Sequence, residues 1–457
     1  MIPVLTPAEM AEVDRSAPEP FEVLVRRAAG AVARAASDLL GGGYGRRVVV
    51  VAGPGHNGDD GRVAADLLAR RGVRVEVVDA RACPPVLPPS DLVVDAAFGT
   101  GFRGTFDFPD PDGAPVLAVD VPSGVDGLTG ATAGRPAHAV ATVTFAALKP
   151  GLLLGSGPEH AGEVVVADIG LDVGGATAAL VTDADVRAWV PERGPDDHKW
   201  RHAVWVVGGS PGMVGAPTLA ATAAFRSGAG YVRLSVPGAT TVDAPLESVV
   251  VALPERDWAE SVVADQRRFR VLAVGPGLGR STDAVAGVRS LLGRVDVPVV
   301  VDGDALWSLG TDAPAVLSTR TAPTVLTPHD GEYERLVGSP PGDDRLAAAR
   351  GLAVATGAVV LLKGPTTVVA DPSGSALLVR SGDARLATAG TGDVLTGVVA
   401  AFVACGAEPF RAAAAAAHLH GRAAGRCPRR GTVAADVAAA LPAAWDALGS
   451  VDADDES

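Results

Sequence analysis

The stretch Leu386–Gly397 has residue types and an order suited to phosphoryl chemistry. It reads LATAGTGDVLTG, so small residues lead into a Gly-Thr-Gly turn, Asp393 follows, and an apolar run suited to a helix begins at Val394. Backbone N–H groups at a helix start lack partners and, with the helix dipole, favour a phosphate anion. They also predict an ionised Asp393 at neutral pH, placed to accept a proton from a hydroxyl group. The alternative is a glycine turn that caps a buried helix.

Polar loops in the first half of the chain form a second candidate site. Three strand-like runs end in loops that span residues 53–61, 95–104 and 120–126. Because the carboxyl ends of parallel strands meet at one edge of a sheet, these loops are expected to converge on one ligand.

The first of these loops also fits a dinucleotide-binding pattern. Gly53, Gly55 and Gly58 satisfy GxGxxG between a strand and a helix. A carboxylate at Asp59 is unsuited to a pyrophosphate and suits a cation or a hydroxyl better. A dehydrogenase therefore stays as an alternative interpretation.

Alternating strand and helix patterns must position these loops, which predicts an α/β protein with parallel sheets in two domains. In the first half we expect helices over 5–40 and 63–71 and strands over 46–51, 73–80, 91–101, 116–120 and 141–147. In the second half we expect helices over 216–230 and 411–424 and strands over 203–210, 231–237, 271–279, 298–306, 324–332 and 358–371. A Pro- and Asp-rich segment, 189–197, separates the halves, so we place the domains at 1–192 and 193–457. A fragment from about Pro195 onward is expected to fold alone.

Composition limits the possible partners and compartment. The 457 residues carry a net charge of −14, which argues against nucleic acid or an anionic membrane as partner. Three widely spaced cysteines and the lack of an apolar run of roughly 20 residues or of a secretory signal predict a cytoplasmic protein in a reducing compartment. Only three lysines occur, Lys149, Lys199 and Lys363, so each is a candidate for a role that arginine cannot fill. His418 and His420, two residues apart on a predicted helix, are expected to be structural.

Several motifs in one order give the chain a specific resemblance. GPGHNGDDG (53–61), VVDAAFGTGFRG (93–104) and VDVPSGVDGLTG (119–130) resemble the NAD(P)H-hydrate epimerase family. HKW (198–200), VVGGSPGMVGAPTLAATAAFRSGAG (206–230), AVGPGLG (273–279), VLTPHDGE (325–332), KGPTTVV (363–369) and AGTGDVLTG (389–397) resemble the nucleotide-dependent NAD(P)H-hydrate dehydratases. The resemblance implies a Rossmann-like three-layer sandwich followed by a ribokinase-like α/β domain, and two enzyme activities fused in one chain.

For the first domain, the resemblance implies a potassium ion held by oxygen ligands of Asn57, Asp95 and Ser123, and a proton-transferring carboxylate at Asp120. The chain departs from the family pattern NNGGDG at His56 and Asp59, and a side chain at the latter is expected to weaken or retune the site. Lys149 is given no catalytic role. The residues expected to contact the hydrated nucleotide are His56, Asn57, Gly58, Asp59, Asp60, Gly99, Thr100, Gly101, Phe102, Arg103, Gly104, Thr105 and Asp120.

For the second domain, the resemblance implies phosphorylation of the hydroxyl on carbon 6 of the hydrated ring, followed by elimination, with ADP as the co-substrate and Mg²⁺ accompanying the nucleotide. Asp393 is the expected base. The substrate is expected at Ala216, Gly277, His329 and Asp393, and the nucleotide at Lys363, Gly364, Pro365, Thr366, Thr367, Gly390, Thr391 and Gly392.

Other interpretations of the second domain stay open. A ribokinase-like kinase of a small vitamin alcohol, with the first domain as a nucleotide-binding module, uses the same anion hole. A nucleotide sensor without catalysis is a third possibility. We expect small-molecule substrates, no nucleic acid or membrane partner, and a homo-oligomer.

Overall fold

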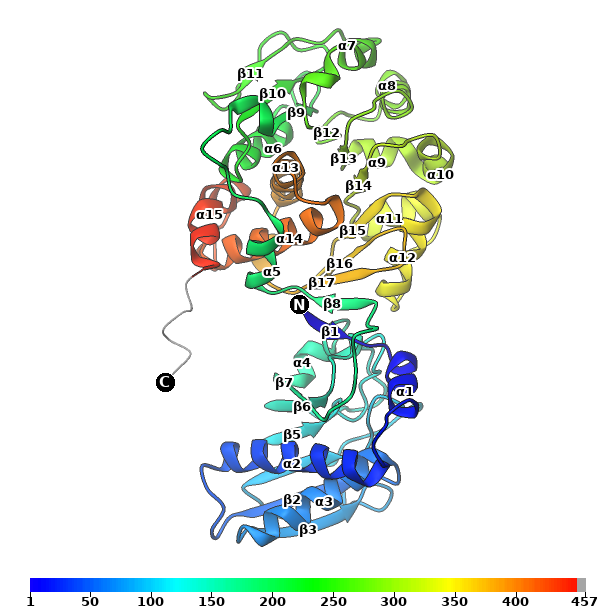
Figure 1. The fold of residues 1–457 in the computed structure, drawn as a ribbon, viewed down its shortest axis with the longest axis vertical. Coiled ribbons are helices and arrows are strands. Elements are labelled where there is room, and N and C mark those ends of the chain that lie inside the picture. Colours follow the sequence, from blue (N-terminus) through cyan, green and yellow to red (C-terminus); the bar gives the residue numbers. More distant parts are fainter. Residues whose placement is uncertain (450–457) are drawn as a thin grey trace. The chain divides into compact units, whose positions relative to one another are not determined.

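The computed structural model describes residues 1–449 and contains two compact units (Figure 1). The first unit covers Ile2–Ala179, and the second begins at Leu180 and also takes in Met1. Both units are built from parallel strands and helices, which confirms the predicted fold class.

The first unit has one sheet of six parallel strands in the order β3-β2-β4-β5-β6-β7. Helices α2 and α3 cover one face of the sheet, whereas loop residues such as Leu87 and Phe108 cover the other. Its elements are β1 (Ile2–Val4), α1 (Pro7–Arg15), α2 (Phe21–Leu40), β2 (Arg47–Ala52), α3 (His56–Arg70), β3 (Arg74–Asp79), β4 (Leu92–Ala96), β5 (Val116–Val119), β6 (Ala141–Phe145), α4 (Gly157–Ala161) and β7 (Glu163–Ala167), with a 3-10 helix at Pro150–Leu152.

The continuous valine run of β2 is fully buried from Val48 to Ala52 because both faces of the sheet are covered. Strands β2, β4 and β5 are neighbours, so the three polar loops predicted to converge do leave the same edge of the sheet. The helix predicted over 5–40 is two helices, because the segment between them contains Pro18 and Pro20 and cannot continue α1.

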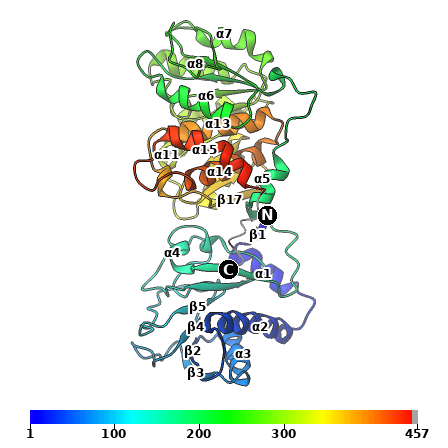
Figure 2. The ribbon, with the colours of Figure 1, turned by 90° about the vertical axis from the view of Figure 1, so that its left-hand side faces the viewer.

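The second unit contains a larger sheet, in which β9 to β17 follow the order β17-β16-β15-β14-β13-β12-β9-β10-β11. All pairs are parallel except β15/β16 and β16/β17. Helices α6, α13, α14 and α15 lie on one face, and α8 to α12 lie on the other (Figures 1 and 2). The strands are β9 (Ala203–Val207), β10 (Tyr231–Ser235), β11 (Val249–Val250), β12 (Val271–Val274), β13 (Val299–Val301), β14 (Thr324–Leu326), β15 (Val359–Leu362), β16 (Thr367–Ala370) and β17 (Ala376–Val379), and β8 (Ala178–Leu180) spans the division between the units.

The helices of the second unit form the two outer layers. They are α5 (Asp183–Trp189), α6 (Gly215–Arg226), α7 (Trp258–Asp265), α8 (Thr282–Leu292), α9 (Asp304–Leu309), α10 (Ala313–Leu317), α11 (Asp330–Val337), α12 (Arg345–Thr356), α13 (Thr391–Ala404), α14 (Pro409–Gly425) and α15 (Ala434–Ala447), with 3-10 helices at Lys199–His202, Gln266–Arg268, Gly310–Asp312 and Ala384–Leu386. Helix α13 packs closely on α6, since a Cβ at Gly397 would lie 2.1 Å from the carbonyl oxygen of Ala220.

The division between the units lies earlier than the predicted boundary between residues 192 and 193. Val181 N–H donates to the carbonyl oxygen of Leu378 in β17, 3.0 Å away, so the sheet of the second unit already holds this segment. Helix α5 then packs on α14, where Asp183 accepts from His418 at 2.5 Å and pairs with Arg422 at 3.0 Å. His418 therefore has a structural contact, as predicted.

This difference changes the expected behaviour of fragments. A fragment that begins at Leu180 is expected to unfold in one cooperative transition. Its free energy of unfolding should equal that of the second unit in the full chain. A fragment that begins at Pro195 lacks α5, leaves His418 without its carboxylate, and should have a melting temperature lower by several degrees. Thermal unfolding of the two fragments, followed by circular dichroism, measures the difference. Equal melting temperatures would show that α5 adds nothing to the second unit.

Candidate active sites

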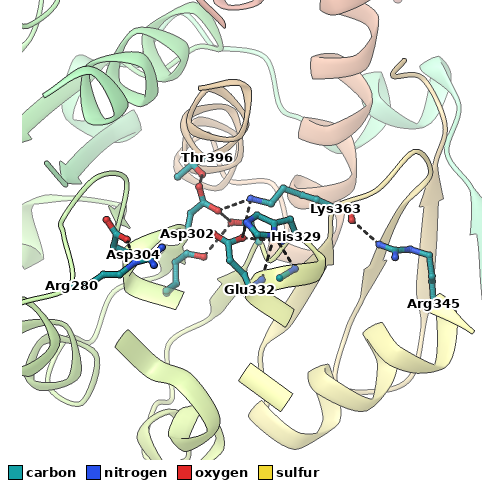
Figure 3. A network of polar contacts seen from close by, with 11 residues as sticks. Arg280, Asp302, Asp304, His329, Glu332, Arg345, Lys363 and Thr396 are labelled. Atoms are coloured by element: carbon teal, nitrogen blue, oxygen red, sulfur yellow. Dashed lines mark hydrogen bonds and ion pairs between the residues drawn. The ribbon is translucent and has the colours of Figure 1, made fainter. Parts of the chain in front are cut away.

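A network of buried polar side chains joins three strand ends and one helix in the second unit (Figure 3). Asp302 follows β13 and accepts hydrogen bonds from Thr327 after β14, at 2.7 Å, and from Thr396 of α13, at 2.8 Å. The Lys363 ammonium, which follows β15, lies 2.9 Å from Asp302 and 3.5 Å from Glu332. Four segments far apart in the sequence thus fix one lysine at the carboxyl edge of the sheet.

The network keeps both members of its central ion pair charged. Burial would raise the pKa of Asp302, yet the Lys363 ammonium and the two threonine hydroxyls hold that pKa below its usual value. Burial would lower the pKa of Lys363, but Asp302 and Glu332 raise it above its usual value. The site therefore presents a fixed positive charge in a region that is otherwise acidic.

Asp393 lies in the first turn of α13, and Gly390 is the N-cap in a left-handed conformation. Burial raises the pKa of Asp393 to about 7, the carboxylates of Asp302, Glu332 and Asp304 add to the shift, and Lys363 opposes it. The predicted ionisation of Asp393 at neutral pH is therefore only partial, because burial and three neighbouring carboxylates bring its pKa close to 7. A carboxyl group with a pKa near 7 is well matched to proton transfer at neutral pH.

The residues predicted to hold the nucleotide lie at two adjoining places. A Cβ at Gly392 would lie 3.5 Å from the Lys363 Nζ, so the start of α13 faces the lysine. Lys363, Gly364, Pro365, Thr366 and Thr367 form the hairpin between β15 and β16, with Arg345 donating to the Lys363 carbonyl at 2.7 Å. The Thr391 hydroxyl donates to the carbonyl oxygens of Leu386 and Thr388, so it fixes the turn.

The predicted substrate residues of this unit lie in two groups. Ala216 and Gly277 are neighbours, since a Cβ at Gly277 would lie 3.4 Å from that of Ala216. His329 caps α11: its Nδ1 accepts from the N–H groups of Gly331 and Glu332, and its ring is largely exposed. This capping role is structural, and it leaves only Nε2 available to a ligand.

Sequence reasoning missed three carboxylates of this site: Asp302, Asp304 and Glu332. Asp304 holds the loop after β12, because it accepts a hydrogen bond from the N–H of Gly279 at 2.9 Å. Glu332 completes the capping box of α11. Asp302 directly follows the short valine strand β13 and Asp304 begins α9 (both are labelled in Figure 3), and that position at a strand end was the available signal.

The first unit contains a cavity of about 780 Å³ at the carboxyl edge of its sheet. Its lining includes the predicted residues His56, Asn57, Asp60, Gly99, Thr100, Gly101, Phe102, Arg103 and Asp120. Gly58, Asp59, Gly104 and Thr105 do not line it. The cavity is also lined by Asp14 and Lys149, which were not predicted to lie there.

Asp120 and Lys149 form a buried ion pair in this cavity. Their charged atoms are 2.8 Å apart, and the Lys149 side chain is 1% exposed. The lysine also donates to the Thr144 hydroxyl and to two carbonyl oxygens, and Thr100 N–H donates to Asp120 at 3.0 Å. Burial would raise the pKa of Asp120, but the lysine and these hydrogen bonds hold that pKa below its usual value.

Two of the three glycines in the GxGxxG pattern serve chain packing. A Cβ at Gly53 would lie 1.8 Å from the carbonyl oxygen of Ala97, and one at Gly58 would lie 2.0 Å from the carbonyl oxygen of Gly53. These close approaches account for Gly53 and Gly58 without a pyrophosphate, whereas a Cβ at Gly55 would meet no atom within 4 Å. The Asp59 side chain, which was expected to weaken or retune the site, is half exposed, lies 3.5 Å from Arg62 and does not line the cavity.

The three predicted potassium ligands lie next to the loop from Phe98 to Thr100, which lines the cavity. Asp95 is fully buried, accepts from the Ser123 N–H and hydroxyl, and has no basic partner among the described residues. Burial raises its pKa to about 6. Ser123 also accepts from Phe98 N–H, and the buried Asn57 amide lies beside the next residue, Gly99. Hard oxygen atoms around an uncompensated carboxylate fit a monovalent cation.

Two features are absent from residues 1–449. In this part of the chain no helix is long and apolar enough to cross a membrane. The same residues contain no group of three or more His, Cys, Asp or Glu side chains placed to hold a metal ion.

Comparison with known proteins gives family matches in both halves of the chain. Residues 204–443 match the family described as NAD(P)H-hydrate dehydratase, and residues 21–85 and 79–151 match the YjeF-related protein N-terminus. The chain is 37% identical to the bifunctional NAD(P)H-hydrate repair enzyme Nnr of Moorella thermoacetica, over 96% of both chains, and 39% identical to that of Mycobacterium leprae, over 91% of both.

A solved structure supports the fold of the second unit. The ADP/ATP-dependent NAD(P)H-hydrate dehydratase of Bacillus subtilis, co-crystallised with ATP and Mg²⁺, matches with a TM-score of 0.52 and 30% identity. The match covers 59% of this chain and 98% of the other, so the second unit has the ribokinase-like fold. With both family matches in order along one chain and relatives aligned over nearly its whole length, the protein belongs to the family of bifunctional NAD(P)H-hydrate repair enzymes.

Proposed function

We propose that the protein repairs hydrated NADH and NADPH. The first unit interconverts the R and S hydrates, and the second converts the S hydrate to NAD(P)H at the expense of ADP, with AMP and phosphate as products. The observation that carries the proposal is that, in the dehydratase-like unit, a lysine fixed by Asp302 faces the start of α13, whose first turn carries the half-buried carboxyl group of Asp393.

In the second unit, Lys363 and the N–H groups at the start of α13 would bind the nucleotide phosphates. Asp393 would accept the proton of the C6 hydroxyl as its oxygen attacks the terminal phosphorus of ADP. AMP leaves, and the C6 hydroxyl becomes a phosphate ester. Loss of a proton from C5 and of phosphate from C6 then restores the dihydropyridine, because phosphate is a far better leaving group than hydroxide.

Mg²⁺ would enter with the nucleotide and neutralise charge on its phosphates. We assign it no cage of protein ligands, because residues 1–449 contain no cluster of ligating side chains for one. Glu332 and Asp302, which face Lys363, keep that lysine in place until phosphate oxygens reach it.

In the first unit, Asn57, Asp95 and Ser123 would hold a potassium ion. The ion would compensate the buried Asp95 charge and fix the loop from Phe98 to Thr100, which contributes to the cavity. Asp120 would face the hydrated ring in the cavity and take part in proton transfer.

A product assay separates this function from a kinase of a small alcohol. With purified S hydrate of NADPH, ADP and Mg²⁺, the full-length protein is expected to form NADPH, AMP and phosphate in equal amounts. Reduced-nicotinamide absorbance and phosphate release measure the ratio. Accumulation of a stable phosphorylated alcohol without NADPH would support the kinase instead.

A further inference from the structure

The cavity of the first unit contains a second buried carboxyl group, that of Asp60 in α3. Asp60 is 8% exposed and lines the same cavity as Asp120. Among the described residues, no hydrogen-bond donor or basic side chain contacts its carboxyl oxygens. The inference below rests on the proposed epimerisation at C6 and assigns the two proton-transfer roles in that reaction.

The contacts of Asp120 determine which role it can take. Its carboxylate accepts from Lys149, from Thr100 N–H at 3.0 Å and from the Thr144 hydroxyl at 3.2 Å. Three donors, one of them the buried ammonium, stabilise the negative charge, so this group is ionised before the reaction begins. It is suited to accept a proton from a hydroxyl group.

Asp60 has the opposite surroundings. Burial raises its pKa to about 8, and the carboxylates of Asp120, Asp59 and Asp14 add to the shift. Asp60 therefore carries a proton at neutral pH. The remaining ionisable groups that line the cavity are Arg15, Glu19, His56, Arg103 and Lys149.

We propose that Asp60 donates, and Asp120 accepts, the protons that open and reclose the hydrated ring, with Lys149 as the positioning residue for Asp120. Asp120 takes the proton of the C6 hydroxyl, a C6=O bond forms and the C6–N1 bond breaks. The electron pair of that bond goes to N1, which takes the proton of Asp60. The product is an open-chain aldehyde.

Inversion then needs only rotation about the C5–C6 bond. N1 attacks the other face of the aldehyde and returns its proton to Asp60, while Asp120 returns its proton to the oxygen. Both carboxyl groups end as they began. The Lys149 ammonium in the cavity disfavours the alternative route, loss of water to a cationic ring, because that intermediate would add a second positive charge.

The test uses the full-length protein with purified R hydrate, saturating ADP and KCl, so that its own second unit reports epimerisation as NADPH formation. Asp60→Asn is expected to slow R-hydrate conversion by at least about a hundredfold. Dehydration of the S hydrate should stay unchanged. Asp66→Asn, an exposed carboxylate on the same helix, is the matched control and should behave as wild type. Hydrogen-exchange protection of β2 in Asp60→Asn verifies that the unit is folded.

Three further measurements test the proposed proton transfers and ring opening. Wild-type epimerisation should decline above about pH 8 as Asp60 loses its proton. Lys149→Met should move the lower limb of the pH profile upward, because Asp120 loses the charge that keeps it ionised, whereas a purely structural loss would lower the rate equally at all pH values. Oxygen-18 at C6 should be retained through inversion.

The outcomes distinguish this inference from the proposed function. If wild type epimerises and folded Asp60→Asn does so within about threefold of it, the assignment of the proton donor is wrong. Loss of the oxygen-18 label at the rate of inversion would contradict ring opening. If wild type itself does not convert the R hydrate, the proposed function of the first unit fails and this inference fails with it.

Discussion

Asp393→Asn is expected to slow dehydration of the S hydrate by roughly a hundred- to ten-thousand-fold, the usual effect of losing a positioned general base. The substitution preserves the shape of the first turn of α13 and removes only the ability to accept a proton. ADP binding should stay nearly intact, because Lys363 and the backbone N–H groups are unaffected. Epimerisation by the first unit should be unchanged. NADPH formation and ADP titration by calorimetry measure these effects.

The pH profile gives the control for this variant. Since burial and neighbouring carboxylates place the Asp393 pKa near 7, the wild-type rate should rise as pH increases through about 7, where the group loses its proton. The residual rate of Asp393→Asn should lack that rise. Asp343→Asn, an exposed carboxylate of the same unit, should keep both rate and profile. An Asp393→Asn enzyme within a few-fold of wild type would overturn the role of Asp393.

Lys363→Met should weaken ADP binding roughly 10- to 100-fold, because a charge-assisted hydrogen bond to phosphate contributes about 1.5–3 kcal/mol. The variant should also be less stable. Removing one partner of a buried ion pair costs up to about 3–5 kcal/mol, since Asp302 is left buried without a compensating charge. Calorimetric ADP titration and denaturant unfolding measure the two effects.

A double variant separates these two contributions. In Lys363→Met with Asp302→Asn, the uncompensated charge is gone, and the amide can still bond to the hydroxyls of Thr327 and Thr396. Stability should recover while ADP binding stays weak. If ADP binding recovers together with stability, Lys363 serves folding alone and its place in the nucleotide site is wrong.

Much of the fold follows from residue patterns. Continuous apolar runs such as Val48–Val51 predict strands buried on both faces, and these strands form the expected parallel sheets. The start of α3 was expected at Val63 and lies at His56, because the glycines and polar residues before Val63 resemble a loop. Those glycines are required by tertiary contacts: a Cβ at Gly61 would lie 2.4 Å from that of Ala96 in β4. Such tertiary contacts cannot be recognised from the neighbouring residues in the sequence.

The candidate sites were predictable as loops at strand ends, but not as electrostatic networks. The Asp302–Lys363 and Asp120–Lys149 pairs each join residues from different strands or loops, and no spacing in the sequence marks them. The pKa of Asp393 depends on burial and on three distant carboxylates, whereas its local sequence indicates only the helix dipole. The scarcity of lysine was the one sequence feature that singled out both buried ammonium groups.

The measurement that tests the central claim most directly is the fate of an equilibrated mixture of R- and S-hydrated NADPH given to the full-length protein with ADP, Mg²⁺ and K⁺. Because both units are proposed to act in series, reduced-nicotinamide absorbance should recover completely, with one AMP formed for each hydrate consumed. Recovery that stops at the share of the S form would show an inactive first unit. No recovery with ADP or ATP would contradict the proposed repair function of the chain.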